Sequence, residues 1–215
     1  KRSIDGHSAS PVGKKRFKSI RANTSFKIVA ISDSNKVAKD SIPSSIGIFT
    51  DFKDLISKAA IDMIFISLPN QFASEAVILS LKKGLHVFCE KPPSRTLQEL
   101  LEVKKCSEEN PHLKLMYGFN HRFHLSVEEA KSIINNRSLG NIINMKGVYG
   151  KSEMISFNQT DWRTRRKESG GGILLDQGIH MLDLIRYFSN DEFECLSSYL
   201  TTSYWDIECE DNAFL

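Results

Sequence analysis

The chain of 215 residues is long enough for one large domain or two small ones. Its composition, with 40% hydrophobic and 26% charged residues, is that of a globular protein and excludes a disordered or collagen-like chain. The 29 basic and 26 acidic residues leave a net charge of +3, which is too small for a dedicated nucleic-acid-binding protein.

The cysteines and the apolar runs indicate the cellular compartment of the protein. Cys89, Cys106, Cys195 and Cys209 are widely separated and form no C-x-x-C pair, so we expect reduced thiols rather than disulfides or a zinc site. No apolar run is long enough to cross a bilayer, and the polar first ten residues lack the apolar segment of a signal peptide. These features predict a cytoplasmic protein that binds neither nucleic acid nor a membrane.

Short apolar runs alternate with amphipathic stretches over residues 26–119, which is the pattern of β-α-β units. The short runs predict buried parallel strands at residues 27–32, 61–67, 86–89 and 113–117. The amphipathic stretches predict helices at residues 52–60, 73–83 and 97–109. This part of the chain is therefore expected to form a parallel sheet covered by helices.

The pattern changes after Gly118. It predicts an amphipathic helix at residues 121–136, longer strands at 142–150 and 192–203, and a helix at 173–188. The apolar end of residues 210–215 predicts the start of one more strand. A second region of α+β type is thus expected from about residue 120, and it is expected to be incomplete.

The segment that ends at Gly13 stands where a dinucleotide-binding turn would open the first helix. Asp33 follows Gly13 by 20 residues, the offset at which an acidic residue accepts hydrogen bonds from the adenosine ribose. If Gly13 is the third glycine of G-x-G-x-x-G, Ser8 and Ser10 occupy the first two positions. The residues before the turn include only one strongly apolar residue, Ile4, and are a poor central strand. The alternative is an ordinary basic loop that leads into a helix.

A lysine follows the predicted strand at residues 86–89, in the sequence C-E-K-P-P. This strand ends at the edge of the sheet where open α/β proteins bind their ligands. The two prolines restrict the backbone beside Lys91 and would hold its side chain in place. Lys91 is therefore a candidate functional cation, the alternative being an ordinary solvated charge.

Asp176, His180 and Asp183 share one face of the last predicted helix, because they are spaced i, i+4 and i+7. The helix is otherwise apolar nearly all round and is expected to be buried. A buried histidine beside a carboxylate is suited to accept a proton near neutral pH. The three glycines at 170–172 would let the helix begin close to a ligand. The alternatives are a core histidine bonded by an aspartate, or a metal site; with so few ligands we expect no metal.

The ordered motifs resemble those of the Gfo/Idh/MocA oxidoreductases over residues 14–215. These motifs are E-K-P at 90–92, G-F-N-H-R-F at 118–123, W-R at 162–163, and S-G-G-G at 169–172 followed by the aspartates and histidine of the helix. The resemblance implies a Rossmann-type dinucleotide-binding domain at residues 1–119 and a partial α+β substrate and oligomerisation domain at residues 120–215. The second domain would carry an open, mostly antiparallel sheet. It also implies a small-molecule substrate and a homo-oligomer.

The resemblance assigns catalysis to Lys91, Asp176 and His180. The cofactor contacts expected from the turn and from the resemblance are Ser8, Ser10, Gly13, Asp33, Ser34, Ser67, Leu68, Pro69, Asn70, Glu90, Lys91, Asn120, Trp162 and Arg163. The chain departs from the family where Ser8 and Ser10 replace glycines and where Ala73 stands in place of a histidine found in many members. Members of the family also continue beyond Leu215.

The function expected from these residues is oxidation of a secondary alcohol on a sugar, cyclitol or nucleotide-sugar, with Lys91 and His180 meeting in one cleft. We expect NAD rather than NADP as cofactor, because Asp33 would repel a 2′-phosphate and Ser34 is followed by no arginine. The alternative is a non-catalytic relative or fragment that binds the cofactor poorly and serves in binding or assembly.

A basic loop precedes the three glycines. It holds Arg163, Arg165, Arg166 and Lys167, and arginines bind phosphate and carboxylate groups through paired hydrogen bonds. The loop therefore suggests an anionic substrate, such as a nucleotide-sugar or sugar acid. The alternative is a solvated loop or an oligomer contact.

Overall fold

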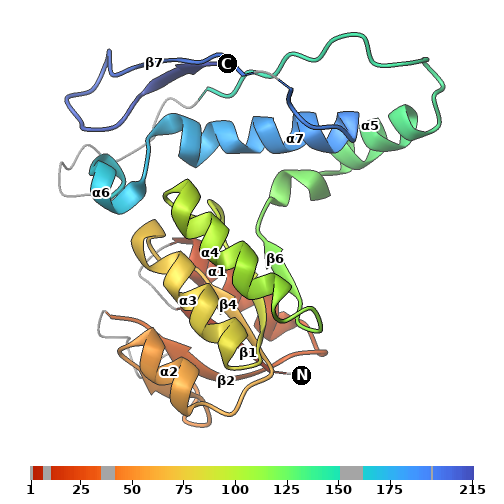
Figure 1. The fold of residues 1–215 in the computed structure, drawn as a ribbon. Helices are drawn as coiled ribbons and strands as arrows, with labels where there is room; N and C mark the ends of the chain where they lie inside the picture. The colour runs from red at the N-terminus through yellow and green to blue at the C-terminus, as the bar shows by residue number, and fades with distance from the viewer. Residues whose placement is uncertain (1, 7–10, 35–41, 151–161, 195) are drawn as a thin grey trace. The chain divides into compact units, whose positions relative to one another are not determined.

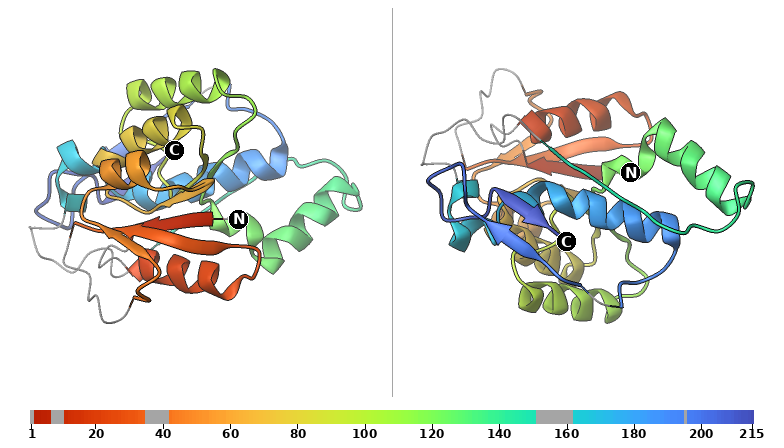
Figure 2. Two further views of the ribbon diagram at one scale, coloured as in Figure 1. Left: turned by 90° about the horizontal axis from the view of Figure 1, so that it is seen from below. Right: turned by 90° about the horizontal axis from the view of Figure 1, so that it is seen from above.

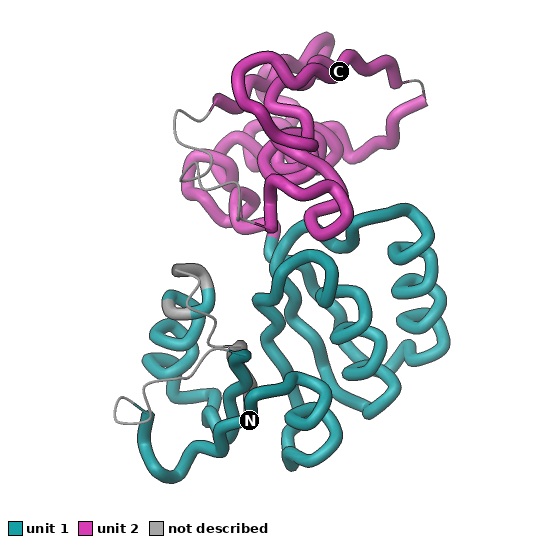
Figure 3. The backbone as a smooth tube through the Cα atoms, turned by 90° about the vertical axis from the view of Figure 1, so that its left-hand side faces the viewer, with its two compact units in different colours: residues 1–118 teal, residues 119–215 magenta. Residues whose placement is uncertain are grey.

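The computed structural model describes residues 2–6, 11–34, 42–150, 162–194 and 196–215 (Figure 1). The chain divides into two compact units, unit 1 at Lys1–Gly118 and unit 2 at Phe119–Leu215 (Figure 3). No helix in the described part of the chain is long and apolar enough to span a membrane.

Unit 1 is a parallel sheet with helices on both faces. Its strands are β1 (Arg2–Gly6), β2 (Lys27–Ser32), β3 (Gly47–Phe49), β4 (Met63–Ile66), β5 (His86–Cys89) and β6 (Leu115–Tyr117). They lie in the order β3-β2-β1-β4-β5-β6 and all their pairings are parallel. The helices are α1 (Pro11–Ala22), α2 (Phe52–Lys58), α3 (Asn70–Lys82) and α4 (Leu97–Glu108). Figure 2 shows α1 on one face of the sheet and α3 and α4 on the other. The predicted parallel α/β architecture is confirmed.

The first strand corrects the sequence prediction. The segment expected to be a poor central strand forms β1, which lies between β2 and β4 in the middle of the sheet. It pairs with β2 along its length, with a register shift between Ser3 and Ile4, and with β4 through Asp5 and Phe65. The hydrogen bonds of a sheet are made by the backbone, so two neighbouring strands can hold a segment with little apolar character of its own. The short edge strand β3 was not predicted.

Helices α2, α3 and α4 bury the apolar stripes that predicted them. Leu55 of α2, Val77 and Leu81 of α3, and Val103 of α4 are each at most 1% exposed. They pack in one cluster with Ile64, on β4. Full burial of such a side chain stabilises a fold by about 1.5–3 kcal/mol, and this cluster holds α2, α3 and α4 on the sheet.

Unit 2 combines helices with a small antiparallel sheet. Its elements are η2 (Asn120–Phe123), α5 (Leu125–Asn135), η3 (Trp162–Thr164), α6 (Arg166–Ser169), η4 (Leu174–Gly178), α7 (Ile179–Ser189), β7 (Tyr199–Thr201) and β8 (Asn212–Phe214). β7 and β8 pair antiparallel, and β8 is the strand predicted at residues 210–215. The α+β character expected of this region is confirmed.

Several boundaries in unit 2 differ from the sequence prediction. The helix predicted at 121–136 is interrupted at His124, which separates η2 from α5. The described residues 142–150 form no strand, and of the described residues within 192–203 only Tyr199–Thr201 do. A strand needs a partner for its backbone groups, and apolar alternation alone does not supply one. The helix predicted at 173–188 begins as the π-helical turn η4 and continues as α7.

The two units differ in what they bury. In the described part of the chain, Cys209 is the only buried hydrophobic residue of unit 2; all the others belong to unit 1. Within α7 only His180 and Asp183 are buried, so the prediction of a helix buried on all sides is wrong. The described part of unit 2 has only two short strands on which such a helix could pack. Cys89, Cys106 and Cys209 are buried free thiols, and Cys195 lies outside the described residues.

Candidate active site

The carboxyl ends of the parallel strands bring predicted cofactor contacts to one edge of unit 1. Asp33, Ser67 and Glu90 directly follow β2, β4 and β5. The backbone ladder continues one residue beyond the strands: Asp33 N–H donates to Phe49 C=O at 3.0 Å, and Glu90 N–H donates to Ile66 C=O at 2.9 Å. These residues are therefore held by the sheet itself, at the edge where such folds bind ligands.

The predicted cofactor contacts at this edge of the sheet differ in how deeply they are buried. Asp33 is 6% exposed and Ser67 is 8% exposed, whereas Ser34 is exposed. Leu68 and Pro69 are half-buried, and Asn70 begins α3. A buried carboxylate at the end of β2 fits recognition of the ribose of a dinucleotide.

The dinucleotide turn is described only in part. Gly13 is buried in the first turn of α1, as the third glycine of such a turn would be. Ser8 and Ser10 lie outside the described residues. Together with Asp33, the position of Gly13 fits the pyrophosphate and ribose of a bound dinucleotide.

Glu90 is tied to α1 by an ion pair that the sequence did not reveal. Arg16 Nε donates to Glu90 Oε1 at 2.5 Å, and the Arg16 guanidinium lies 5.2 Å from the centre of the Phe88 ring. A Cβ atom at Gly118 would lie 2.7 Å from Glu90 Oε2, so the glycine makes room for this carboxylate. The only signal in the sequence was an arginine one turn after Gly13, which is too common a pattern to be informative.

Lys91 follows Glu90 in a well-anchored loop. Its side chain is half-buried, and the Lys91–Pro92 peptide bond is cis. Beyond the prolines, Ser94 Oγ donates to Thr96 C=O at 2.9 Å, and Arg95 forms an ion pair with Glu99. Lys91 belongs to unit 1, whereas Asp176 and His180 belong to unit 2, so their meeting stays a prediction.

His180 lies among aromatic rings in unit 2. It is 4% exposed, at the start of α7. The ring of His121 stacks on it with centroids 4.0 Å apart and an interplanar angle of 18°. Tyr149 is nearly parallel to it at 6.4 Å, and the ring of Phe119 meets it edge-on at 6.1 Å. The sequence indicated the buried histidine but not the rings around it.

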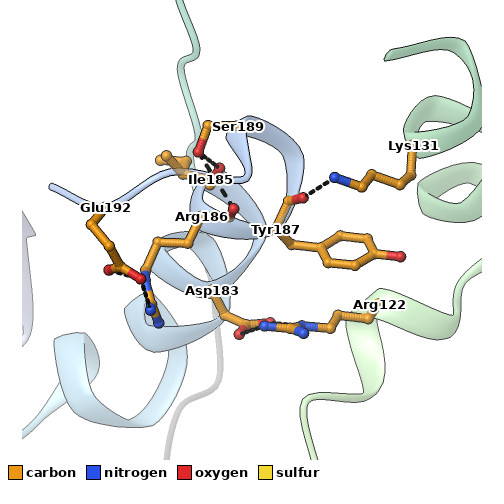
Figure 4. A network of polar contacts seen from close by, with 8 residues as sticks. All are labelled: Arg122, Lys131, Asp183, Ile185, Arg186, Tyr187, Ser189 and Glu192. Atoms are coloured by element: carbon orange, nitrogen blue, oxygen red, sulfur yellow. Dashed lines mark hydrogen bonds and ion pairs between the residues drawn. The ribbon is translucent and has the colours of Figure 1, made fainter. Parts of the chain in front are cut away.

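Asp183 pairs with an arginine that the sequence did not indicate. Its carboxylate accepts from Arg122 Nε at 2.8 Å and from Arg122 Nη2 at 2.5 Å (Figure 4). This hydrogen bond raises the pKa of Arg122 above its ordinary value. Tyr187 lies beside the pair: its ring is 4.9 Å from the Arg122 guanidinium, and its C=O accepts from Lys131 Nζ at 2.5 Å. Asp183 therefore fixes η2 against α7.

Asp176 lies in the π-helical turn η4 rather than in the α-helix that was expected. Its carboxylate is half-buried and accepts from Gln177 Nε2 at 2.7 Å. A π-helical turn holds more residues than an α-helical one, so the spacing of four residues between Asp176 and His180 no longer places them directly above each other. Such turns occur frequently at functional sites.

The three glycines serve a contact within the protein. Gly172 N–H donates to Glu210 Oε1 at 2.7 Å, and Ile173 N–H donates to Glu210 C=O at 2.9 Å. A Cβ atom at Gly172 would lie 1.9 Å from the Glu210 carbonyl oxygen. Gly170 has a φ of 86° at the end of α6. The close approach expected for a ligand is thus made, at Gly172, by the chain's own backbone.

The basic loop is largely engaged with carboxylates. Arg165 pairs with Glu168 at 2.7 Å. The backbone N–H of Arg166 donates to the Glu208 carboxylate at 2.9 Å, and its guanidinium donates to Glu208 C=O at 3.1 Å. A surface pocket beside Arg165 is also lined by Asp206 and Glu208. These contacts favour a structural role for Arg165 and Arg166.

The remaining candidates lie at the start of η2 and in η3. Asn120 is exposed and begins η2. Trp162 and Arg163 are half-buried in η3, with the guanidinium 4.4 Å from the centre of the indole ring. In the described part of the chain, no three His, Cys, Asp or Glu side chains lie together as a metal site requires.

Comparisons with known proteins agree with this geometry. Residues 6–119 match the model of an oxidoreductase family with an NAD-binding Rossmann fold, and residues 127–215 match the GFO/IDH/MocA C-terminal domain. The chain is 30% identical over 169 residues to glucose-6-phosphate 3-dehydrogenase of Bacillus subtilis, a match that covers 77% of this chain and 47% of that protein.

Inositol dehydrogenases are also among the similar proteins. Myo-inositol 2-dehydrogenase of Thermotoga maritima is 29% identical over 177 residues, covering 78% of this chain and 48% of that protein. The crystal structure of myo-inositol 2-dehydrogenase from Lactobacillus plantarum has a TM-score of 0.76 and 31% identity, covering 88% of this chain and 56% of that one. The chain thus spans about half the length of the curated relatives it matches. With both domain models matched in order, the chain belongs to the GFO/IDH/MocA family of oxidoreductases and carries its NAD-binding Rossmann fold.

Proposed function

We propose that the protein containing this chain is an NAD-dependent dehydrogenase that oxidises a secondary alcohol of a sugar or cyclitol. The observation that carries the proposal is the buried imidazole of His180, enclosed by aromatic rings, in a chain of this oxidoreductase family. Relatives named as glucose-6-phosphate 3-dehydrogenase and myo-inositol 2-dehydrogenase support the substrate class.

The proposed cofactor contacts lie mainly at the carboxyl edge of the unit 1 sheet. Asp33 would accept hydrogen bonds from the ribose hydroxyls, and its charge favours NAD over NADP because it repels a 2′-phosphate. When bound, NAD supplies the hydride acceptor. The other proposed contacts are Ser8, Ser10, Gly13, Ser34, Ser67, Leu68, Pro69, Asn70, Glu90, Lys91, Asn120, Trp162 and Arg163.

The proposed catalytic residues act on the substrate hydroxyl group that is oxidised. A ring nitrogen of His180 takes the proton of the substrate hydroxyl, which leaves an oxygen with growing negative charge. The Lys91 ammonium stabilises this charge as a fixed cation until the carbonyl bond of the product has formed. Asp176 orients His180 and Lys91.

The substrate itself is proposed to be a sugar or cyclitol, whether or not it carries a charge. For an anionic substituent, the proposed contact in the basic loop is Arg163, in η3. Comparison of glucose 6-phosphate with glucose and myo-inositol separates these cases. A strong preference for glucose 6-phosphate that is lost in an Arg163→Gln variant would support an anionic substrate.

Two variants test the proposed function. His180→Asn and Lys91→Met should each lower kcat by about 10²–10⁴-fold, because each removes a group that acts on the reacting oxygen, while NAD binding by His180→Asn stays unchanged. NADH formation is measured with the three substrates above, and NAD binding is measured by calorimetry. His112→Asn, at an exposed position of unit 1, is the matched control and should behave as the unaltered protein.

Two outcomes would overturn the proposal. Full activity of His180→Asn would remove the assigned base. An absence of NAD binding even at millimolar concentration would favour the non-catalytic alternative, in which Ser8 and Ser10 impair the dinucleotide turn.

A further inference from the structure

Unit 2 contains a pair of histidines stacked face to face. The rings of His121 and His180 are 4.0 Å apart between centroids, with only 18° between their planes. His180 is 4% exposed, whereas His121 is only half-buried. This is the closest aromatic pair in the described part of the chain.

The stack is held from both sides. The ion pair between Arg122 and Asp183 joins η2 to α7, and these two elements carry His121 and His180. Tyr149 lies parallel to the His121 ring at 5.7 Å, with an angle of 10°. His121 therefore cannot leave His180 without breaking contacts on neighbouring residues.

Two imidazoles at this distance cannot both carry a proton without a penalty. Like charges this close disfavour each other, and the effect is strong where water is excluded. The first proton goes to the less buried ring, His121, because desolvation opposes a charge on His180. The second proton, on His180, is then taken up only at lower pH.

Other titratable groups lie around the pair. His124 lies 5.1 Å from the His121 ring and is exposed, so solvent screens its charge. The Asp183 carboxylate is matched by Arg122. The half-buried Asp176 carboxylate, in the π-helical turn before His180, accepts from Gln177 Nε2; its charge favours a proton on either ring and does not remove the repulsion between two protonated rings.

We propose that His121 is a positioning residue for the catalytic base: by accepting the first proton, it keeps His180 neutral and able to take the proton of the substrate. The proposal rests on the role proposed above for His180. It also explains how a dehydrogenase of this family would retain its base at pH values where an isolated histidine is protonated.

The first experiment measures protonation directly in the free protein. Histidines are labelled and titrated by NMR in the unaltered chain, in His121→Phe and in His180→Phe, each of which keeps a flat ring and removes one titrating group. In the unaltered chain, the second proton should bind about one pH unit lower than the proton of either single histidine. If the unaltered titration equals the sum of the two single-variant titrations, the histidines are independent and the proposal is wrong.

The second experiment measures the effect of the same coupling on the pH dependence of catalysis. In His121→Phe, the acid limb of the kcat/KM profile should move up by about one pH unit, so that kcat/KM on that limb falls about tenfold, while kcat near neutral pH changes little. His121→Gln, which is also uncharged but lacks the ring, should shift the limb in the same direction if the charge is responsible. His124→Phe is the matched control and should leave the limb in place.

The two experiments separate this proposal from the proposed function. Coupled titrations combined with full activity of His180→Phe would overturn the assignment of His180 as base, and with it the catalytic role of His121. Loss of activity in His180→Phe combined with an unshifted acid limb in both His121 variants would overturn only the role of His121.

Discussion

At the scale of single residues, Gly172 packs so closely against the backbone of Glu210 that no side chain fits at this position. A Cβ atom there would lie 1.9 Å from the backbone oxygen of Glu210, a distance that a side-chain rotation cannot relieve. We expect Gly172→Ala to destabilise unit 2 by about 3 kcal/mol or more, as overpacking against backbone does. Gly150→Ala, which meets nothing within 4 Å, is the control. Urea unfolding of both variants is monitored by tryptophan fluorescence. Equal urea midpoints for the two variants would contradict the predicted loss of stability.

Asp211 is a second residue whose environment makes a measurable prediction. Burial acts to raise its pKa, but hydrogen bonds from the backbone N–H groups of Ser203, Trp205 and Tyr204 and from the Asn212 side chain outweigh this effect, so its pKa lies below the ordinary value of 3.8. A carboxylate with a lowered folded-state pKa stabilises the fold above its unfolded-state pKa, and this stabilisation is lost as pH falls through the folded-state pKa.

The corresponding variant is Asp211→Asn. It should lower the free energy of unfolding by about 1 kcal/mol at neutral pH, because an amide is a weaker acceptor for three backbone N–H groups. Urea unfolding of both proteins at a series of pH values checks this. The difference should shrink as the medium becomes acidic, and a difference that is constant with pH would show that the charge of Asp211 does not matter.

At the scale of elements, the link between α1 and the end of β5 is the contact that most affects the cofactor edge. Arg16 and Glu90 have side chains 33% and 17% exposed, so their ion pair is partly shielded from water. We expect Arg16→Gln to weaken NAD binding about tenfold, because Glu90 and the loop that follows it lose their anchor on α1. Calorimetry measures the affinity, and Arg21→Gln, at the exposed end of the same helix, should leave it unchanged.

The elements also show where sequence patterns were informative. Residues 52–60, 73–83 and 97–109 carry apolar side chains at helical spacing, and the structure has α2, α3 and α4 in these regions. The pattern failed at β1, whose place in the sheet is set by the backbone of its neighbours. It failed again at residues 142–150, where alternating apolar residues find no paired strand in the described part of the chain. Periodicity reports which face of a segment is apolar, but not which partner covers it.

At the scale of the whole molecule, the uneven burial predicts stepwise unfolding. The clusters of buried hydrophobic residues lie in unit 1, whereas unit 2 buries mainly polar groups among its described residues. Hydrophobic burial is the main favourable term in folding, so unit 2 should unfold at lower urea concentration than unit 1. The two tryptophans, Trp162 and Trp205, both belong to unit 2 and report on it alone.

The measurement compares two probes on one sample. Tryptophan fluorescence should change at lower urea than far-ultraviolet circular dichroism, to which α1, α2, α3 and α4 of unit 1 contribute strongly. Coincident transitions by the two probes would mean that the chain unfolds as one cooperative body.

The sequence by itself determined the parallel α/β architecture of unit 1 and the grouping of Asp33, Ser67 and Glu90. Both follow from local patterns, because apolar runs define the strands and parallel strands bring their carboxyl ends to one edge. Only the tertiary structure decided that His121 stacks on His180, that Arg122 takes the carboxylate of Asp183, and that Glu210 fills the space beside Gly172. Each of these contacts joins residues tens of positions apart, and its energy depends on distances and angles that no local periodicity encodes.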